Sequence, residues 1–329
     1  MAEILEKSAT IFEENARLMR RATVAAVAVA VLLVFVKMVA WWLTDSVSLL
    51  SSLVDSMLDV GASLVNLLAV RHALQPADYE HRFGHGKAEH LAGLGQAAFV
   101  VGAAVFLLIE ASHRLVHPRA VEHGEIGIAV MLFAIVVTFA LVHFQRRVVR
   151  KTGSVAIDAD SLHYTGDVLI NASVILSLVL GSYFGWGILD PLFGGLIALY
   201  LLRTAGKIAV LSLDPLMDHE LPEEDRERIR KIVRTHLEVK NLHDLRTRKS
   251  GITTFIQLHL ELDGKMTLRH AHDVADEVEK NLAEAFPEAE IIIHEDPDGV
   301  DESRSSYPSR RRAPGRFLQI LLGLPKGRG

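Results

Sequence analysis

Residues 53–71 read LVDSMLDVGASLVNLLAVR, an apolar stretch that carries two carboxylates, Asp55 and Asp59, four positions apart. Positions four apart share one face of a helix, so this spacing predicts two neighbouring carboxylates on a membrane-spanning helix. An ionisable side chain inside a bilayer costs several kcal/mol unless it is paired, hydrated or bound to an ion. The stretch therefore indicates a functional site within the membrane.

A second pair with the same spacing, His163 and Asp167, lies in a later stretch that is also apolar. Further polar residues share the two faces: Ser48, Ser52, Ser63 and Asn66 in the first stretch, and Asp160 and Asn171 in the second. We expect the two polar stripes to face each other. Lys37 is the one basic residue that could neutralise the carboxylates, and we expect its side chain to extend toward the membrane surface instead.

Three carboxylates and one imidazole form a set of four nitrogen and oxygen ligands, Asp55, Asp59, His163 and Asp167. This set suits tetrahedral zinc and excludes copper(I), while iron(II), cadmium, cobalt and nickel stay open. Without metal the carboxylates leave three negative charges in the membrane. We therefore expect protons to replace the metal on the return step, with His163 and Asp59 as their carriers.

The composition is that of a membrane protein, with 50% hydrophobic residues over 329 positions and a mean hydropathy of +0.26. The absence of cysteine excludes disulfide scaffolds, thiolate metal sites and cysteine nucleophiles, whereas sixteen histidines favour nitrogen ligation. A membrane helix needs about 20 apolar residues. Six such windows occur, at 22–43, 47–70, 88–112, 125–144, 159–184 and 188–210.

These windows predict a six-helix transmembrane domain over residues 22–211, preceded by a cytoplasmic segment, 1–21. Lys and Arg outside the windows concentrate at the N-terminus and in the second-to-third and fourth-to-fifth loops. By the positive-inside rule, both termini are expected on the cytoplasmic side of the membrane.

After the sixth window the sequence changes to that of a small soluble domain, residues 212–298. Helical and alternating patterns predict the order helix, strand, strand, helix, strand, which is an α+β ferredoxin-like (αββαβ) domain with its helices on one face. The predicted elements are a helix starting near 221–224, strands at 242–248 and 254–262, a helix at 268–286 and a strand at 289–294. The basic tail, 299–329, is expected to be disordered.

Two further histidine groups lie outside the windows. Asp78, His81 and His85 fall within eight residues of one loop, where spacing alone favours a metal site barely more than a solvated loop. In the soluble domain, alternation places His259 on the sheet face opposite the helices, and the neighbouring strand carries a second group. His294 and Asp296 are that group, and His243 and His272 are additional candidate ligands.

Five motifs together resemble those of the cation diffusion facilitator family, and within it the bacterial ferrous-iron/zinc efflux branch. The motifs are LVDSMLDVGASLVNLLAVR, LQPADYEHRFGHGKAE (74–89), LHYTGDV (162–168), HDLRTRKSG (243–251) and IIIHEDP (291–297), and the resemblance runs from about Arg20 to Pro297. It implies six helices, a cytoplasmic ferredoxin-like domain, a homodimer, and zinc export driven by proton entry.

The resemblance also implies roles for particular residues. It places the transport site at the four membrane ligands, a loop site at Asp78, His81 and His85, and a binuclear cytoplasmic site at His243, His259, His272, His294 and Asp296. It further implies an ion pair between Lys87 and an acidic residue after the sixth span, for which Asp218 is the candidate. This pair would couple the membrane and soluble parts at the dimer axis.

We therefore expect a homodimeric zinc/proton antiporter of the bacterial inner membrane, which exports metal from the cytoplasm by alternating access. Zinc is expected to be both transported and regulatory. Its expected partners are divalent metal cations, protons, the lipid bilayer and a second copy of the chain, and no nucleic acid. A metalloenzyme is disfavoured because no HExxH motif occurs. The main rival is a metal-gated channel, and the third reading, a pure metal sensor, leaves the membrane carboxylates unexplained.

Overall fold

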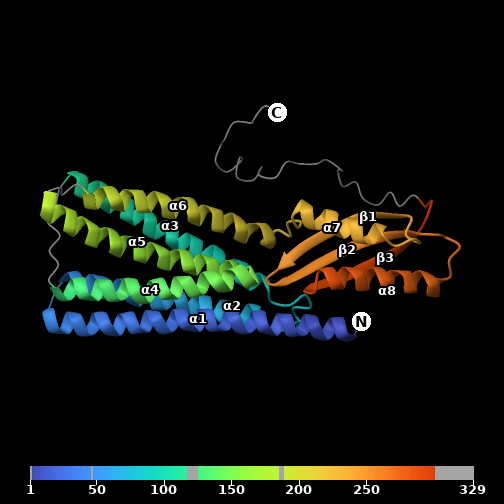
Figure 1. Ribbon diagram of the computed structural model, residues 1–329, viewed down its shortest axis with the longest axis horizontal. Coiled ribbons are helices and arrows are strands. Elements are labelled where there is room, and N and C mark those ends of the chain that lie inside the picture. The colour runs from blue at the N-terminus through green and yellow to red at the C-terminus, as the bar shows by residue number, and fades with distance from the viewer. Residues whose placement is uncertain (1, 46, 117–124, 185–188, 301–329) are drawn as a thin grey trace, which may run out of the picture.

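The computed structural model describes residues 2–45, 47–116, 125–184 and 189–300, and Figure 1 shows a long helical bundle with an α/β domain at one end. The basic tail predicted over 299–329 lies outside the described residues from 301 onward. The elements are α1 (Ala2–Thr44), α2 (Val47–Ala73), α3 (Lys87–Val116), α4 (Glu125–Thr152), α5 (Val155–Phe184), α6 (Leu189–Leu216), α7 (Glu223–Arg234), β1 (Asn241–Ser250), β2 (Thr253–Leu262), α8 (Leu268–Ala285) and β3 (Ala289–Pro297).

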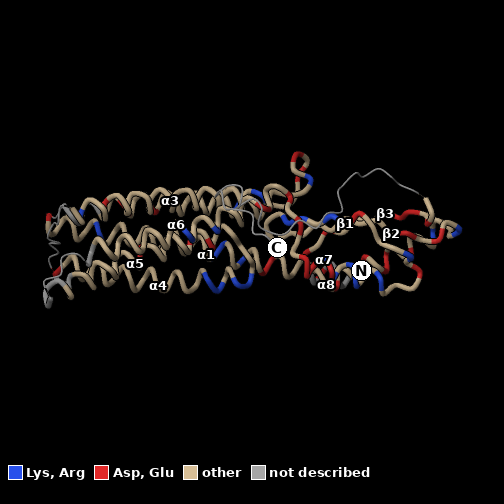
Figure 2. The backbone as a smooth tube through the Cα atoms, turned by 90° about the horizontal axis from the view of Figure 1, so that it is seen from above, with Lys and Arg blue, Asp and Glu red and all other residues tan. Residues whose placement is uncertain are grey.

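Five helices in the described part of the chain, α1, α2, α3, α4 and α6, are long and apolar enough to cross a membrane. The sequence predicted six. Helix α5 is not among the five, although it runs the length of the same bundle (Figure 1). In Figure 2 the charged residues concentrate in the α/β domain and at the adjacent end of the bundle, and the rest of the bundle carries few.

Helix α1 is much longer than the predicted span. Its 43 residues contain neither Pro nor Gly, so no residue interrupts the helix, and it measures about 65 Å against a bilayer core of about 30 Å. The segment predicted as separate, 1–21, is from Ala2 onward the first half of this helix. In Figure 1 this half extends beside the α/β domain, where α1 contacts α8.

The α/β domain has the predicted order of elements around a three-stranded sheet, β1-β2-β3. Strand β1 is antiparallel to β2, and β2 is parallel to β3, so α8 makes the crossover between them. Helices α7 and α8 cover one face, as the alternation predicted. The core consists of Ile229, Val233, Val274, Val278 and Leu282 from the helices and Ile256, Leu258, Leu260 and Leu262 from β2.

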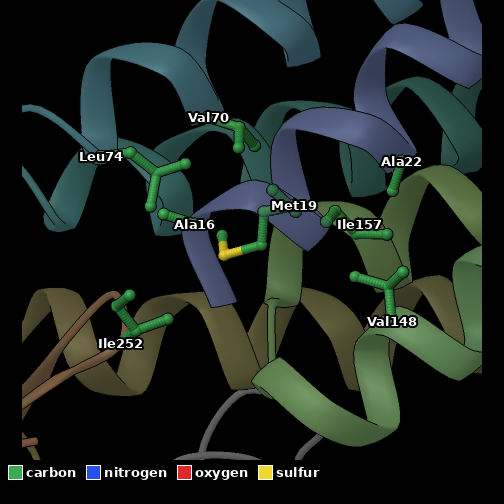
Figure 3. Packing of buried hydrophobic residues seen from close by; sticks show 9 residues of the cluster. Ala16, Met19, Ala22, Val70, Leu74, Val148, Ile157 and Ile252 are labelled. Carbon is green, nitrogen blue, oxygen red and sulfur yellow. The ribbon is translucent and has the colours of Figure 1, made fainter. Parts of the chain in front are cut away.

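The turn between β1 and β2 docks against the bundle. Ile252 is 7% exposed, and Figure 3 shows it beside a cluster of helix residues that includes Met19, Val70 and Leu74. Gly86, just before α3, lies so close to the turn that a Cβ on it would be 2.4 Å from the carbonyl oxygen of Ser250. The two parts of the molecule are therefore packed together at this turn as well as joined through the chain.

Candidate metal sites

The first candidate site joins α2 and α5 inside the bundle. The Nε2 atom of His163 lies 3.0 Å from Oδ1 of Asp59 and 3.8 Å from Oδ2 of Asp167. Each of the three residues offers a ligand atom within 4.8 Å of the others, and the His163 side chain is 8% exposed. The polar stripes predicted on the two helices thus face each other, since the spacing of four places each pair on one helix face.

Two other predicted features of this site have a different geometry. Asp55, one turn before Asp59 on α2, is exposed and does not belong to the group of three. Lys37 turns inward: its Nζ atom donates to Oγ of Ser56 at 2.6 Å and to the carbonyl oxygen of Ser52 at 3.1 Å. The expectation that Lys37 extends toward the membrane surface is therefore wrong, because α2 offers it two acceptors within the bundle.

The second candidate site is the loop between α2 and α3. One oxygen of Asp78 accepts the backbone N–H groups of His81 and Glu80 at 2.6 and 2.9 Å. The N–H of His81 is the main cause that holds the pKa of Asp78 below its ordinary value of 3.8, so the carboxylate is ionised at neutral pH. His81 and His85 each place a ring nitrogen 3.3 Å from this carboxylate. The structure thus brings together the three residues that spacing alone could not assign.

His72 belongs beside this loop and was missed. It lies in the last turn of α2, and its ring centroid is 4.6 Å from that of the buried His85. Nothing in the spacing of the loop residues points to it, because it comes before the loop on a helix.

The third candidate site lies across the sheet. His243, His259 and His294 are direct partners in the strand register, one on each strand. The buried carboxylate of Asp296 lies between them, at 3.3 Å from His243, 2.7 Å from His259 and 3.2 Å from His294. A buried acid surrounded by imidazoles is a typical arrangement for a divalent metal.

Two acidic residues extend this group and one predicted histidine lies apart from it. Glu261 is 3.0 Å from Nδ1 of His243, and Asp244 is 3.9 Å from Nε2 of His259. Alternation along β2 places Glu261 on the same face as His259. Asp244 cannot be placed by alternation, because β1 is irregular between His243 and Arg246. His272 on α8 is exposed and lies 3.8 Å from Asp276, outside this group.

Lys87 and Asp218, the residues of the predicted ion pair, are in contact with each other. Nζ of Lys87 lies 2.9 Å from Oδ1 of Asp218, and Arg248 of β1 contacts the same oxygen at 3.3 Å. Partial burial raises the pKa of Asp218, but the hydrogen bonds from Lys87 and Arg248 outweigh it and hold the pKa below 3.8. Sequence reasoning missed Arg248, which comes from a strand distant in sequence.

Arg248 also stacks on two aromatic rings. Its guanidinium lies 4.7 Å from the ring centroid of Phe83 and 4.5 Å from that of Phe255. Phe255 is only 2% exposed, although alternation along β2 places it on the open face of the sheet. The open face is therefore covered at this end by Phe83 from the loop, and the loop site and the sheet belong to one contact region.

Two family models match successive parts of the chain. Residues 23–217 match the cation efflux transmembrane domain, and residues 221–298 match the cytoplasmic domain of cation efflux proteins. The chain is 48% identical to the cation-efflux pump FieF of Klebsiella pneumoniae over 284 residues, which cover 86% of this chain and 94% of that pump. FieF of Escherichia coli O1:K1 is equally similar, at 48% identity over 284 residues.

Solved structures match about a quarter of the chain. The metal-bound C-terminal domain of the CzcD transporter from Thermotoga maritima is 30% identical, covers 24% of this chain and 95% of that domain, and has a TM-score of 0.24. A structure of the putative zinc transporter CzrB is 38% identical over 24% of this chain and 99% of that chain, with a TM-score of 0.23.

The resemblance found in the sequence motifs is confirmed by these matches to full-length pumps. The relatives are transporters and not enzymes, and the bundle is that of a multi-pass membrane protein. The chain belongs to the cation diffusion facilitator family and is a divalent metal cation efflux pump.

Proposed function

We propose that this pump exports zinc from the cytoplasm in exchange for protons, by alternating access around Asp59, His163 and Asp167, with Asp55 as the fourth ligand. The observation that carries the proposal is the group of one imidazole and two carboxylates within 4.8 Å of one another inside the bundle. Asp55 lies one helix turn from Asp59, so a small rotation of α2 brings it into the same coordination shell.

Zinc is the favoured ion because the site mixes nitrogen and oxygen ligands. A neutral imidazole with carboxylates suits tetrahedral zinc, whereas an all-oxygen site suits harder ions. Iron(II), cadmium, cobalt and nickel accept the same ligands and are the competing cargoes. We also propose zinc as the ion of the loop and sheet sites, where it regulates transport from the cytoplasmic side.

Proton exchange follows from the charge of the site. Zinc with three carboxylates and a neutral imidazole leaves one excess negative charge, and the metal-free site would hold three. Protons on His163 and Asp59 reduce that charge, so the site can return through the membrane without metal. Because the same groups bind either protons or zinc, the two cargoes move in opposite directions.

The proposed architecture has α5 as the sixth span. Its 30 residues measure about 45 Å, longer than the bilayer core of about 30 Å, and α3, α4 and α6 pack against it, which shields its polar residues from lipid. We further propose a transmembrane domain over 22–211, a ferredoxin-like domain over 212–298, a homodimer in the bacterial inner membrane, and cytoplasmic termini. The Lys87–Asp218 pair then couples the two domains.

The test is zinc flux into proteoliposomes that contain a pH-sensitive dye, with the pH gradient imposed in either direction. Wild type should move zinc one way and protons the other, and Asp59→Ala and Asp167→Asn should abolish both. Asp158→Asn is the matched control, since it removes a carboxylate from the same helix outside the site. Zinc flux that ignores the gradient would indicate a channel, and flux that survives Asp59→Ala would refute the site.

A further inference from the structure

A second group of polar side chains lies inside the bundle and takes no part in the proposed transport site. One residue comes from each of four helices: Asn66 from α2, Gln96 from α3, Gln145 from α4 and Asp160 from α5. All are buried: Asp160 and Gln145 are 0% exposed, Asn66 is 3% and Gln96 is 7%. A buried carboxylate surrounded by three carboxamides requires an explanation, because polar groups are costly to bury without partners.

The hydrogen bonds of this group leave several atoms without partners. Gln145 donates through Nε2 to one oxygen of Asp160 at 2.7 Å, and Gln96 approaches the other at 3.5 Å. The amide of Asn66 also faces this carboxylate. Within the described residues, however, Oδ1 and Nδ2 of Asn66 and Oε1 of Gln145 have no hydrogen-bond partner. Two buried amide oxygens beside a buried carboxylate are oxygen ligands that suit a cation.

In the described part of the chain, no Lys or Arg side chain neutralises the group. Among the described residues, Asp160 forms no ion pair with Lys or Arg, and the basic group that acts on it is His163, almost one helix turn away. His163 is already a ligand of the proposed transport site. A mobile cation could therefore neutralise the carboxylate of Asp160.

The group is reached from a groove between α2 and α3. The groove has a volume of about 650 Å³, and Asn66, Gln96 and His72 supply polar groups to its otherwise apolar lining. His72 is also the residue whose ring contacts His85 of the loop site. Polar groups therefore follow one another from the loop, past His72, to Asn66 and Asp160.

The group lies on the same path as the transport site. Asp59, Ser63 and Asn66 follow one another on α2, and Asn66 is about 10 Å along the helix from Asp59, toward the C-terminal domain. Between them Ser63 and Tyr164 form a hydrogen bond of 2.7 Å. The transport site and the group around Asp160 are thus two positions along α2, and the hydrogen bond between Ser63 and Tyr164 lies between them.

We propose that Asp160, Asn66 and Gln145 form a staging site, which holds a divalent cation on its way from the cytoplasmic side to the transport site. The proposal rests on the proposed transport function. With one carboxylate and neutral oxygens, the staging site binds more weakly than the transport site, and the cation keeps part of its water. Weak binding suits a position that must release its ion onward.

The first test is zinc binding to the purified full-length protein in detergent. Equilibrium dialysis should be done on a variant that lacks the other three sites through His163→Ala, His85→Ala and His259→Ala. One weakly bound zinc per chain should remain. Adding Asp160→Asn or Asn66→Ala should remove it, and adding Asp158→Asn should leave it. The proposal would be overturned if no residual zinc is found, or if the residual zinc persists after Asp160→Asn and after Asn66→Ala.

Asn66→Ala separates binding from folding. Neither amide atom of Asn66 has a geometric hydrogen-bond partner within the described residues, so Asn66→Ala removes only the approach of this amide to the Asp160 carboxylate. Asp160→Asn alone could loosen the contacts to Gln96 and Gln145 without any ion being involved. Loss of the residual zinc in Asn66→Ala protein that unfolds at the wild-type temperature therefore supports a ligand role.

The second test is transport in proteoliposomes over a range of zinc concentrations. Asp160→Asn and Asn66→Ala should each raise KM for zinc about tenfold and leave kcat near the wild-type value, because high zinc fills a weakened site. A lower kcat with unchanged KM would contradict the staging role. If Asp59→Ala still transports zinc, the proposed function is refuted. The staging site is judged independently, by the zinc-binding measurement.

Discussion

Gly86→Ala tests whether the β1–β2 turn is locked against the bundle. An added Cβ would meet the carbonyl oxygen of Ser250 at 2.4 Å and its carbonyl carbon at 2.6 Å, more than 1 Å inside ordinary contact for the oxygen. The φ angle of Gly86 is not positive, so alanine is strained only by this clash. Backbone atoms cannot turn aside as a side chain can. We therefore expect the docked turn to lose about 1–3 kcal/mol.

The absence of cysteine supplies the assay. Ser250→Cys is nearly isosteric and places the only thiol of the chain at a position that is 5% exposed. Undocking by 1–3 kcal/mol should raise the rate of maleimide labelling about 5- to 150-fold when Gly86→Ala is added. Gly102→Ala is the matched control, because nothing lies within 4 Å of its added Cβ. An unchanged labelling rate in Gly86→Ala would refute the close packing.

Three further outcomes are expected. Asp218→Asn should lower stability at pH 7 by less than about 1 kcal/mol, because its ion pairs are half exposed. Since the folded pKa of Asp218 lies below 3.8, the stabilisation by these pairs is fully present above pH 3.8 and is lost as the pH falls through the folded pKa. The thermal unfolding temperatures of variant and wild type should therefore converge in acid. His259→Ala should weaken zinc binding by the C-terminal domain at least about tenfold in calorimetry, and His272→Ala should weaken it less. An equal loss of zinc affinity in the two variants would contradict this prediction. Phe83→Ala should destabilise the protein by about 1–2 kcal/mol in an unfolding assay, because the Phe83 ring packs on Phe255 at a centroid distance of 5.7 Å and against the guanidinium of Arg248. Tyr79→Ala is the control: it removes a 95% exposed ring from the same loop and should change the free energy of unfolding by no more than about 0.5 kcal/mol.

Periodicity explains what the sequence could predict. Two pairs four residues apart place Asp59, His163 and Asp167 on facing helix surfaces, and alternation along β2 places His259 opposite the helices. Both patterns are local, so both can be read without the fold. The order of elements in the C-terminal part follows for the same reason. The ion pair of Lys87 with Asp218 came from the family resemblance, since neither residue has a periodic signature.

Contacts between distant segments could not be predicted. Ile252 is a single apolar residue within a turn, and no pattern in its neighbours indicates that it packs against Met19 and Leu74. Asp244 joins the sheet histidines only because β1 has an irregularity there. Lys37 turns inward because α2 presents acceptors to it, which depends on how two helices pack.

The docked turn limits how the C-terminal domain can rotate. A rigid body attached at one point can turn about three axes, but a body attached at two points can turn only about the line between them. This domain is attached at residues 217–222, through the chain, and at Ser250–Ile252, through packing on Gly86 and the helix cluster. The contact between α1 and α8 holds the domain at a further place. If that contact opens while Ile252 stays buried, the histidines of the sheet can move only along an arc about that line.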